Sequence, residues 1–346
     1  MDNIEKIDLA PGYQIPRIIN GGYQWKDISR ADVMALALAQ ADAGLLAFET
    51  ADTYPGGEDL LGEVQARRRR DGTPPIRIHT RYTPDITDRV PSSREVEMML
   101  DDALIRLRSD HVDLLQLQWW QLERPGWLDV YGWLTELCHT GKIAHVGLSN
   151  FTLDALKSIV GSGLPVASNQ VQISLIDQRA LGEMGDFCLA HDIALLGYGP
   201  LCGGYLARPM QDPKSQAADY SKEYRLMVDL SGGWDLLQDL VSVLLDIAER
   251  HHVDASTVAL RWALDQAGVS ALLLGASSPG NIDRNLAAFD LKLTPEDEQA
   301  IKGVLDQMKP PSGGPGELER DPYGAFRKMI EESARSLSNE PADRTG

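Results

Sequence analysis

The sequence predicts an α/β protein and, within that class, a (β/α)8 barrel, the TIM-barrel fold. Two observations lead to it: short apolar segments alternate with longer segments of helical periodicity, and polar residues stand at the ends of nearly all the apolar segments. The chain of 346 residues is long for one domain, but parallel barrels reach this size as a unit. We expect one barrel domain over residues 1–308 and a partly flexible C-terminal extension over 309–346.

Eight apolar segments have the length and composition of strands. They are RIIN (17–20), LLAFE (45–49), IRIHTR (76–81), VDLLQLQ (112–118), IAHVGLS (143–149), VASNQVQ (166–172), IALLGY (193–198) and ALLLGA (271–276).

The segments between these strands have apolar residues at three- or four-residue spacing, which predicts helices. They cover about 31–43, 58–68, 93–107, 127–140, 152–160, 178–191, 235–250 and 256–266. Strict alternation implies right-handed parallel crossovers, and eight of them close into a barrel. An open doubly wound sheet is the alternative, and the absence of a GxGxxG motif after the first strand counts only weakly against it.

Two segments do not follow the alternation. The stretch at about 207–233 reads as a polar loop that follows a strand, which would place it on the face where barrel enzymes carry their sites. From Lys309 onward, PPSGGPG and the final NEPADRTG have the composition of flexible chain.

Composition narrows the function classes. A net charge of −18 would repel nucleic acid and anionic membrane surfaces, so any anionic ligand must be held by local groups. The three cysteines, Cys138, Cys188 and Cys202, have no CxxC spacing and predict neither a disulfide framework nor a metal site. The N-terminus has no basic region followed by an apolar run. We expect a cytoplasmic protein with a small-molecule substrate, and the oligomeric state stays open.

The carboxyl ends of the predicted strands carry a ring of polar residues, where barrel enzymes place their catalytic groups. A single residue of this kind is easily explained as a solvated loop residue, but a nearly complete ring predicts an active site. In chain order the ring contains Glu49 and Tyr54, Arg81, Gln118, Ser149 and Asn150, Gln170, Tyr198, and the turn at 275–278.

Four motifs at these strand ends resemble those of the aldo-keto reductase superfamily. FETADTYPGGEDLLG (48–62) resembles the segment in which Phe-Asp-Thr-Ala precedes the catalytic tyrosine, and GLSNF (147–151) resembles Gly-Val-Ser-Asn-Phe. GYGPLCGGYL (197–206) is similar to the Tyr-Ser-Pro-Leu segment, and LLLGASSPGNIDRNLAAF (272–289) to the segment that closes over the adenosine end of NADPH. The resemblance covers about residues 15–305 and implies a barrel reductase.

The resemblance also implies the cofactor NADP. Ser149, Asn150 and Gln170 match positions that bond the nicotinamide carboxamide, and Tyr198 matches the aromatic residue that stacks on the ring. The chemistry is suitable, because an amide needs donors and acceptors and a flat ring needs a flat partner.

Further cofactor positions follow from the same resemblance. Residues 199–203 would follow the pyrophosphate, with glycines that allow close approach of the backbone. Arg284 stands where the family often has Glu and could grip the 2′-phosphate, favouring NADP over NAD; a surface ion pair with Asp283 or Asp290 is the alternative. Besides Ser149, Asn150, Gln170 and Tyr198, the implied cofactor positions are Gly22, Tyr23, Gly199, Pro200, Leu201, Cys202, Gly203, Gly275, Ser277, Asn281, Arg284 and Asn285.

The catalytic tetrad implied by the family is Asp, Tyr, Lys and His, and here the matching residues are Glu49, Tyr54, Arg81 and Gln118. Arg81 can supply the positive charge that lowers the pKa of a tyrosine, but it stays protonated and cannot relay a proton. Gln118 can donate a hydrogen bond but cannot titrate. The exchanges keep charge at two positions and hydrogen bonding at the third, which predicts altered chemistry with Tyr54 as a working acid.

Three functions remain open at this point. The first is an NADP-dependent oxidoreductase that reduces a carbonyl, imine or conjugated double bond. The second is an isomerase, epimerase or lyase without net hydride transfer, and the third is a nucleotide-binding regulatory subunit. Trp119, Trp120 and Trp25, with Tyr23, could line an aromatic substrate pocket or pack in the core.

Overall fold

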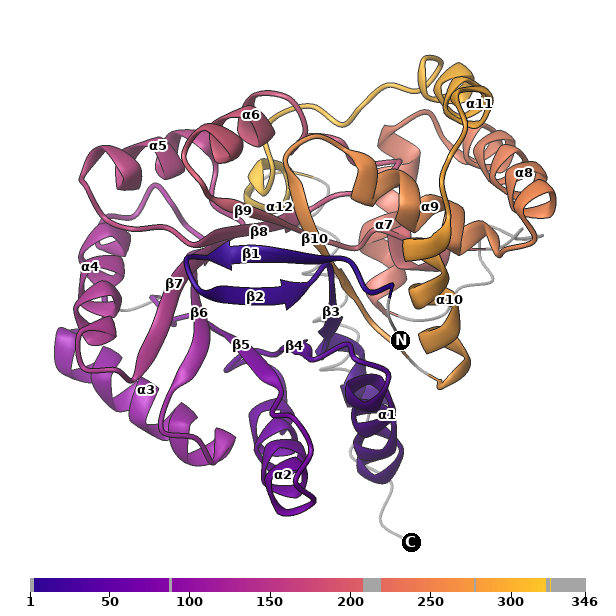
Figure 1. Cartoon of the computed structure of the whole chain (residues 1–346). Coiled ribbons are helices and arrows are strands. Elements are labelled where there is room, and N and C mark those ends of the chain that lie inside the picture. The colour runs from indigo at the N-terminus through magenta and orange to yellow at the C-terminus, as the bar shows by residue number, and fades with distance from the viewer. Residues whose placement is uncertain (1–2, 87–88, 208–218, 277, 322–323, 325–346) are drawn as a thin grey trace, which may run out of the picture.

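Eight parallel strands close into a barrel in the computed structural model, which describes residues 3–86, 89–207, 219–276, 278–321 and 324 (Figure 1). The order around the barrel is β10-β3-β4-β5-β6-β7-β8-β9. The strands are β3 (Ile18–Gly21), β4 (Ala47–Glu49), β5 (Arg77–Tyr82), β6 (Val112–Gln118), β7 (Ile143–Ser149), β8 (Ser168–Gln172), β9 (Ala194–Tyr198) and β10 (Val269–Leu274). The predicted barrel is therefore confirmed, and the pairing of β10 with both β3 and β9 excludes an open sheet.

Helices surround the barrel, as Figure 1 shows. Those that the sequence predicts are α1 (Arg30–Asp42), α2 (Gly57–Arg70), α3 (Ser93–Leu107), α4 (Trp127–Cys138), α5 (Leu153–Gly161), α6 (Glu183–Ala190), α8 (Trp234–His251) and α9 (Ala255–Asp265). Their starts follow local chemistry: Ser92 and Glu95 form a reciprocal capping box at the start of α3, which satisfies otherwise unpaired backbone donors. The apolar faces of the helices pack on the outside of the barrel in one large core cluster.

Several elements lie outside the predicted set. They are the hairpin β1 (Lys6–Ala10) and β2 (Tyr13–Pro16), the short 3-10 helices η1 (Tyr23–Asp27) and η2 (Cys202–Gly204), and the α-helices α7 (Asp219–Leu230), α10 (Gly280–Asp290), α11 (Pro295–Leu305) and α12 (Glu317–Arg320). The expectation of a polar loop at about 207–233 is wrong for its described part, where Met227 and Val228 of α7 are buried in the core. Residues 208–218 lie outside the described residues.

The hairpin closes the amino-terminal end of the barrel, just before β3 begins (Figure 1). Leu9 and Ile15 are buried together with inward-facing strand residues such as Leu114 and Leu196. The Tyr13 hydroxyl lies 2.8 Å from Nε2 of buried His79. One end of the barrel is therefore plugged, so a ligand has to approach from the carboxyl ends of the strands.

The C-terminal extension packs against the barrel as far as it is described. The backbone N–H of Lys309 donates to the carbonyl of Ser231 at 3.1 Å, and Leu318 contacts the core. The domain boundary at 308 and the flexibility of residues 309–346 stay predictions, because most of the extension lies outside the described residues.

Candidate active site

The polar ring predicted from the strand ends gathers on the open face of the barrel. Glu49 ends β4, Gln118 ends β6, Ser149 ends β7 and Tyr198 ends β9. Arg81 lies one residue before the end of β5. Because these strands are parallel and in register, their last residues meet around one mouth.

Arg81 connects the four residues of the predicted tetrad. Its Nε lies 3.3 Å from Oε1 of Glu49, its Nη1 donates to Oε1 of Gln118 at 3.0 Å, and its Nη2 donates to the hydroxyl of Tyr54. Nη1 also donates to Oγ of Ser149 at 3.5 Å. A lysine has a single side-chain nitrogen, whereas the three guanidinium nitrogens of Arg81 contact all these partners at once. The Glu49 side chain, one methylene longer than Asp, brings its carboxylate to Nε of Arg81.

Arg81 lowers the pKa of Tyr54, as the sequence predicts, but the pKa is raised overall. Burial raises the pKa of the Tyr54 phenol well above its ordinary value, the charge of Glu49 raises it further, and Arg81 opposes both. Burial also raises the pKa of Glu49, against the attraction of Arg81. Arg81 thus acts in the expected direction, but burial, the largest cause, outweighs it, and the nearby charge of Glu49 works against it as well.

The hydrogen bond to Tyr54 keeps its proton available. Arg81 donates to the phenol oxygen and occupies an acceptor position of Tyr54, so the hydroxyl hydrogen can point elsewhere. The raised pKa keeps the phenol protonated at neutral pH. Tyr54 is therefore held as a neutral hydrogen-bond donor.

The groups predicted for the nicotinamide carboxamide lie next to this cluster. Gln170 donates to Oε1 of Glu49 at 3.4 Å and accepts from Gln116 at 2.8 Å. The Tyr198 hydroxyl donates to Oδ1 of Asn150 at 3.1 Å, and Asn150 has a left-handed backbone, with φ of 59°. Gln116 escaped the sequence analysis, although its position two residues before Gln118 places both on the same face of β6.

The backbone at 199–203 makes the predicted tight turns, with positive φ at Gly199 and Gly203. The open sides of these glycines are occupied by a side chain from α7: a Cβ on Gly199 would lie 2.4 Å from the Tyr224 hydroxyl, and a Cβ on Gly203 would lie 2.6 Å from its ring. Cys202 is fully buried and Leu201 packs on the core, so any ligand contact here would involve the backbone. Pro200, which follows Gly199 directly, is buried as well.

The predicted adenosine end lies at the start of α10. Arg284 donates from Nε to the carbonyl of Gly280 at 3.1 Å and from Nη2 to Oδ1 of Asn281 at 3.5 Å. Its nearest acid is Asp254, at 3.7 Å, and not Asp283 or Asp290 as the alternative had it. Asn285 is buried on the same helix.

Two further predicted positions complete this region. Gly275 lies against Gln24, whose Oε1 would be 2.4 Å from an added Cβ. Ser277 lies outside the described residues.

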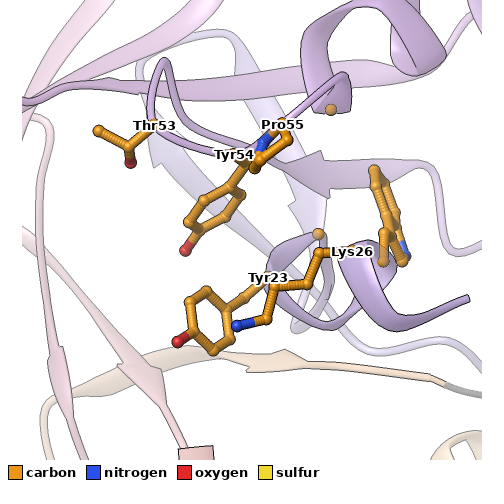
Figure 2. A pocket seen from close by; sticks show the side chains of 8 residues that line it. Tyr23, Lys26, Thr53, Tyr54 and Pro55 are labelled. Atoms are coloured by element: carbon orange, nitrogen blue, oxygen red, sulfur yellow. The ribbon is translucent and has the colours of Figure 1, made fainter. Parts of the chain in front are cut away.

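A pocket of about 140 Å³ opens beside Tyr54 (Figure 2). Tyr23 stands edge-on to Tyr54, with 5.4 Å between ring centroids, and Lys26 lies 4.8 Å from the centroid of Tyr23. The pocket is lined by Gly22, Tyr23, Trp25, Lys26, Thr53, Tyr54, Pro55 and Gly57.

The aromatic lining expected from the sequence is half correct. Trp25 and Tyr23 line the pocket, whereas Trp119 is buried in the core and Trp120 is exposed, and neither lines it. Four lining residues were missed, Lys26, Thr53, Pro55 and Gly57, since nothing in the sequence marks them apart from their closeness to Tyr23 and Tyr54.

The family model for the aldo/keto reductase family matches residues 17–306, which is most of the chain. The chain belongs to the aldo/keto reductase family. The predicted superfamily is thus confirmed.

Two of the relatives align with most of the chain. The chain is 27% identical to dihydrodiol dehydrogenase 3 of Bos taurus over 88% of this chain and 93% of that protein. It is 26% identical to glycerol 2-dehydrogenase (NADP(+)) of Saccharomyces cerevisiae over 88% and 91%. Among solved structures, an aldo/keto reductase from Klebsiella pneumoniae in complex with NADP and acetate superposes with a TM-score of 0.67, at 18% identity over 90% of this chain and 98% of that one.

None of the helices in the described part of this family member has both the length and the apolar character required to cross a bilayer.

Proposed function

We propose that the protein is an NADP-dependent oxidoreductase that reduces a carbonyl, imine or conjugated double bond of a small molecule, with Tyr54 as proton donor. The observation that carries the proposal is the convergence of Glu49, Tyr54 and Gln118 on the single guanidinium of Arg81, next to the pocket. The family membership and the NADP-related names of two relatives support the same reading.

Residues at the strand ends have the chemistry to hold the nicotinamide of NADPH. Bound NADPH would supply the hydride, with Ser149, Asn150 and Gln170 holding the carboxamide and Tyr198 beneath the ring. The donors and acceptors of these side chains suit an amide. The side chain of Tyr224 fills the space where Cβ atoms on Gly199 and Gly203 would stand. A pyrophosphate bound on that side of the turn would displace the Tyr224 ring.

The chain's own groups account for the proton transfer. Tyr54 donates its phenolic proton to the oxygen of the reduced carbonyl, and the guanidinium of Arg81 stabilises the negative charge left on the phenol. Gln118 has a fixed amide hydrogen bond from Arg81 and orients that guanidinium. Glu49 keeps the cluster near neutrality, so that burial does not leave an unpaired cation.

The Tyr198→Ala variant tests cofactor placement. Loss of the stacking ring should raise the Kd of NADPH roughly tenfold, measured by quenching of intrinsic tryptophan fluorescence. The Tyr198→Phe variant keeps the ring, loses only the hydroxyl that bonds Asn150, and should bind within about twofold of wild type. Unchanged binding in Tyr198→Ala, or no NADPH binding to the wild type, would contradict the placement.

Arg284 is proposed to select NADP over NAD. The Arg284→Gln variant should raise the Kd of NADPH roughly tenfold, because it removes a charge-assisted bond to the 2′-phosphate, and should leave the Kd of NADH unchanged. Equal effects on both nucleotides would show that Arg284 acts only through its helix contacts with Gly280 and Asn281.

Product analysis separates net reduction from the other uses of the site. A reductase consumes one NADPH for each product formed. Turnover of a substrate without NADPH consumption would point to an isomerase, epimerase or lyase, and nucleotide binding without any turnover would point to a regulatory subunit.

A further inference from the structure

The C-terminal extension carries a buried cation that the proposed reaction does not use. Arg320 is the last residue of α12, and its Nε, Nη1 and Nη2 are all buried without a hydrogen-bond partner in the described part of the chain. Buried guanidinium groups are normally paired, because five N–H donors removed from water cost free energy when they stay unsatisfied. A guanidinium in this state suits a binding site in which a ligand supplies the missing hydrogen-bond acceptors.

The backbone fixes the position of this guanidinium. Gly316 has φ of +75°, and a Cβ at Gly316 would lie 2.8 Å from both Nη1 and Nη2 of Arg320. The guanidinium therefore packs directly on the backbone of the turn that opens α12. Any larger residue at position 316 would push it away.

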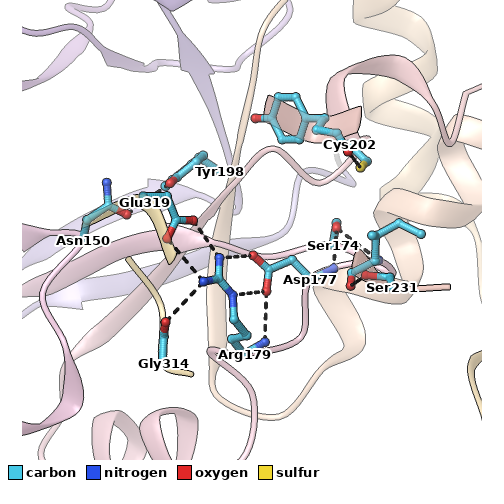
Figure 3. Close-up of polar contacts among 11 residues, drawn as sticks. Asn150, Ser174, Asp177, Arg179, Tyr198, Cys202, Ser231, Gly314 and Glu319 are labelled. Carbon is cyan, nitrogen blue, oxygen red and sulfur yellow. Dashed lines mark hydrogen bonds and ion pairs between the residues drawn. The ribbon is translucent and has the colours of Figure 1, made fainter. Parts of the chain in front are cut away.

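A second arginine, Arg179, attaches the start of the C-terminal extension to the barrel. Arg179, which follows β8, donates from Nη2 to Oε1 of Glu319 at 2.7 Å and from Nη1 to the carbonyl of Gly314 at 3.3 Å (Figure 3). Asp177 completes the pairing of Arg179 at 2.7 Å. Asp177 and Glu319 are therefore both paired with Arg179. We call Asp177, Arg179, Gly314 and Glu319 the clamp, and it holds the helix on which Arg320 stands.

Arg320 directly follows Glu319, the residue through which α12 is bonded to Arg179. Figure 3 shows the clamp in the same region as Tyr198 and Asn150. Burial lowers the pKa of Arg320, and the charges of Glu319, Tyr198, Glu317 and Glu123 act against that shift. Glu123 lies in the loop after β6 and Tyr198 ends β9, so the guanidinium lies within electrostatic range of both sides of the mouth.

We propose that Arg320 recognises an anionic group, a carboxylate or a phosphate, on the carbonyl substrate. This inference rests on the proposed reductase function and narrows its substrate class. A guanidinium offers a planar fork that matches a carboxylate or phosphate with two parallel hydrogen bonds, and such an anion would supply the partners that the buried donors of Arg320 lack. The protein carries a net charge of −18, so an anionic substrate needs such a local cation to be held.

Matched substrate pairs test the proposal. Terephthalaldehydic acid and succinic semialdehyde are each compared with their methyl esters, which keep the aldehyde and remove the charge. Wild type should have a kcat/KM at least about tenfold higher for the better acid than for its ester, and Arg320→Gln should abolish that preference while leaving the esters within about twofold. Arg320→Lys, which keeps the charge without the fork, should retain part of it.

The control is Arg70→Gln, which removes the same charge from an exposed arginine at the end of α2. It should leave the acid-to-ester ratio unchanged. A wild type that reduces acids and esters equally, or an Arg320→Gln variant that keeps the preference, overturns the proposal. Melting temperatures of both variants establish that the fold is intact.

A binding experiment separates this proposal from the proposed function. Calorimetric titration of wild type with benzoate and benzamide should show benzoate binding that is weakened at least about tenfold in Arg320→Gln, even if no aldehyde is reduced. Equal benzoate affinity in the two proteins overturns the anion site. If Arg320→Gln weakens NADPH binding and leaves benzoate binding unchanged, the guanidinium serves a cofactor phosphate and the substrate proposal is wrong.

Discussion

Replacing Tyr54 by Phe is expected to lower kcat/KM for reduction by roughly 10²–10⁴-fold, the usual contribution of a positioned general acid. The change removes one oxygen, which accepts from Arg81, and the proton that the reaction needs. The measurement is steady-state NADPH oxidation with the fastest substrate from a panel of aldehydes and ketones. Binding of NADPH should change little, because the carboxamide groups and Tyr198 are untouched.

The matched control is Tyr82→Phe. Tyr82 follows Arg81 directly on β5, and its side chain belongs to the core cluster outside the barrel, so its loss should leave kcat/KM within about twofold. If Tyr54→Phe keeps the wild-type rate, Tyr54 is not the acid, whatever its position in the site.

The pH profile gives an independent readout of the same role. The pKa of Tyr54 lies above its ordinary value of about 10, so the phenol stays protonated through neutral and mildly alkaline pH. The sign follows from the proton: reduction needs the protonated phenol, and activity through Tyr54 is lost only as pH rises through the raised pKa. A fall in kcat/KM between about pH 7 and 9 that is absent from the Tyr54→Phe variant would contradict this environment.

The sequence was a good guide to the barrel because short, mainly apolar segments that end in polar residues alternate regularly with segments of helical periodicity. Residues 112–118 and 143–149 were predicted with the bounds that β6 and β7 have. The strand-end rule then placed Glu49, Arg81 and Gln118 at one mouth, since parallel strands in register end together. Predicting the strands and placing their last residues at one mouth both rest on the sequence pattern alone, without knowledge of side-chain contacts.

The failures concern contacts between segments distant in sequence. The sign of the pKa shift at Tyr54 depends on burial and on how closely Glu49 approaches Arg81, which no local pattern encodes. The ring of Tyr224 over Gly199 and the pairing of Arg179 with Glu319 join residues that only tertiary packing brings together. The polarity of the stretch before α7 hid the apolar face of that helix.

Restoring the family's tetrad is expected to have the second large effect. The triple variant Glu49→Asp, Arg81→Lys and Gln118→His should raise kcat/KM for a simple aromatic aldehyde at least about tenfold above a low wild-type level. Lysine and histidine can exchange protons, which arginine and glutamine cannot, so the phenol regains a proton relay. The new imidazole should also add a titration to the pH profile near about pH 6.5, which Gln118 cannot provide.

Single exchanges should do little or cause harm, because Arg81 bonds Glu49, Tyr54 and Gln118 as one unit. Arg81→Lys alone leaves one nitrogen for these partners, and Glu49→Asp alone draws the carboxylate away from the guanidinium in a buried site. Thermal melting of each variant separates lost stability from lost chemistry. Adding Tyr54→Phe to the triple variant should abolish its gain, which ties the new activity to the phenol. A wild type that already reduces simple aldehydes at the rate of the triple variant would refute the idea that Arg81 and Gln118 retune the site, and would leave Tyr54 as an acid that needs neither a lysine nor a histidine.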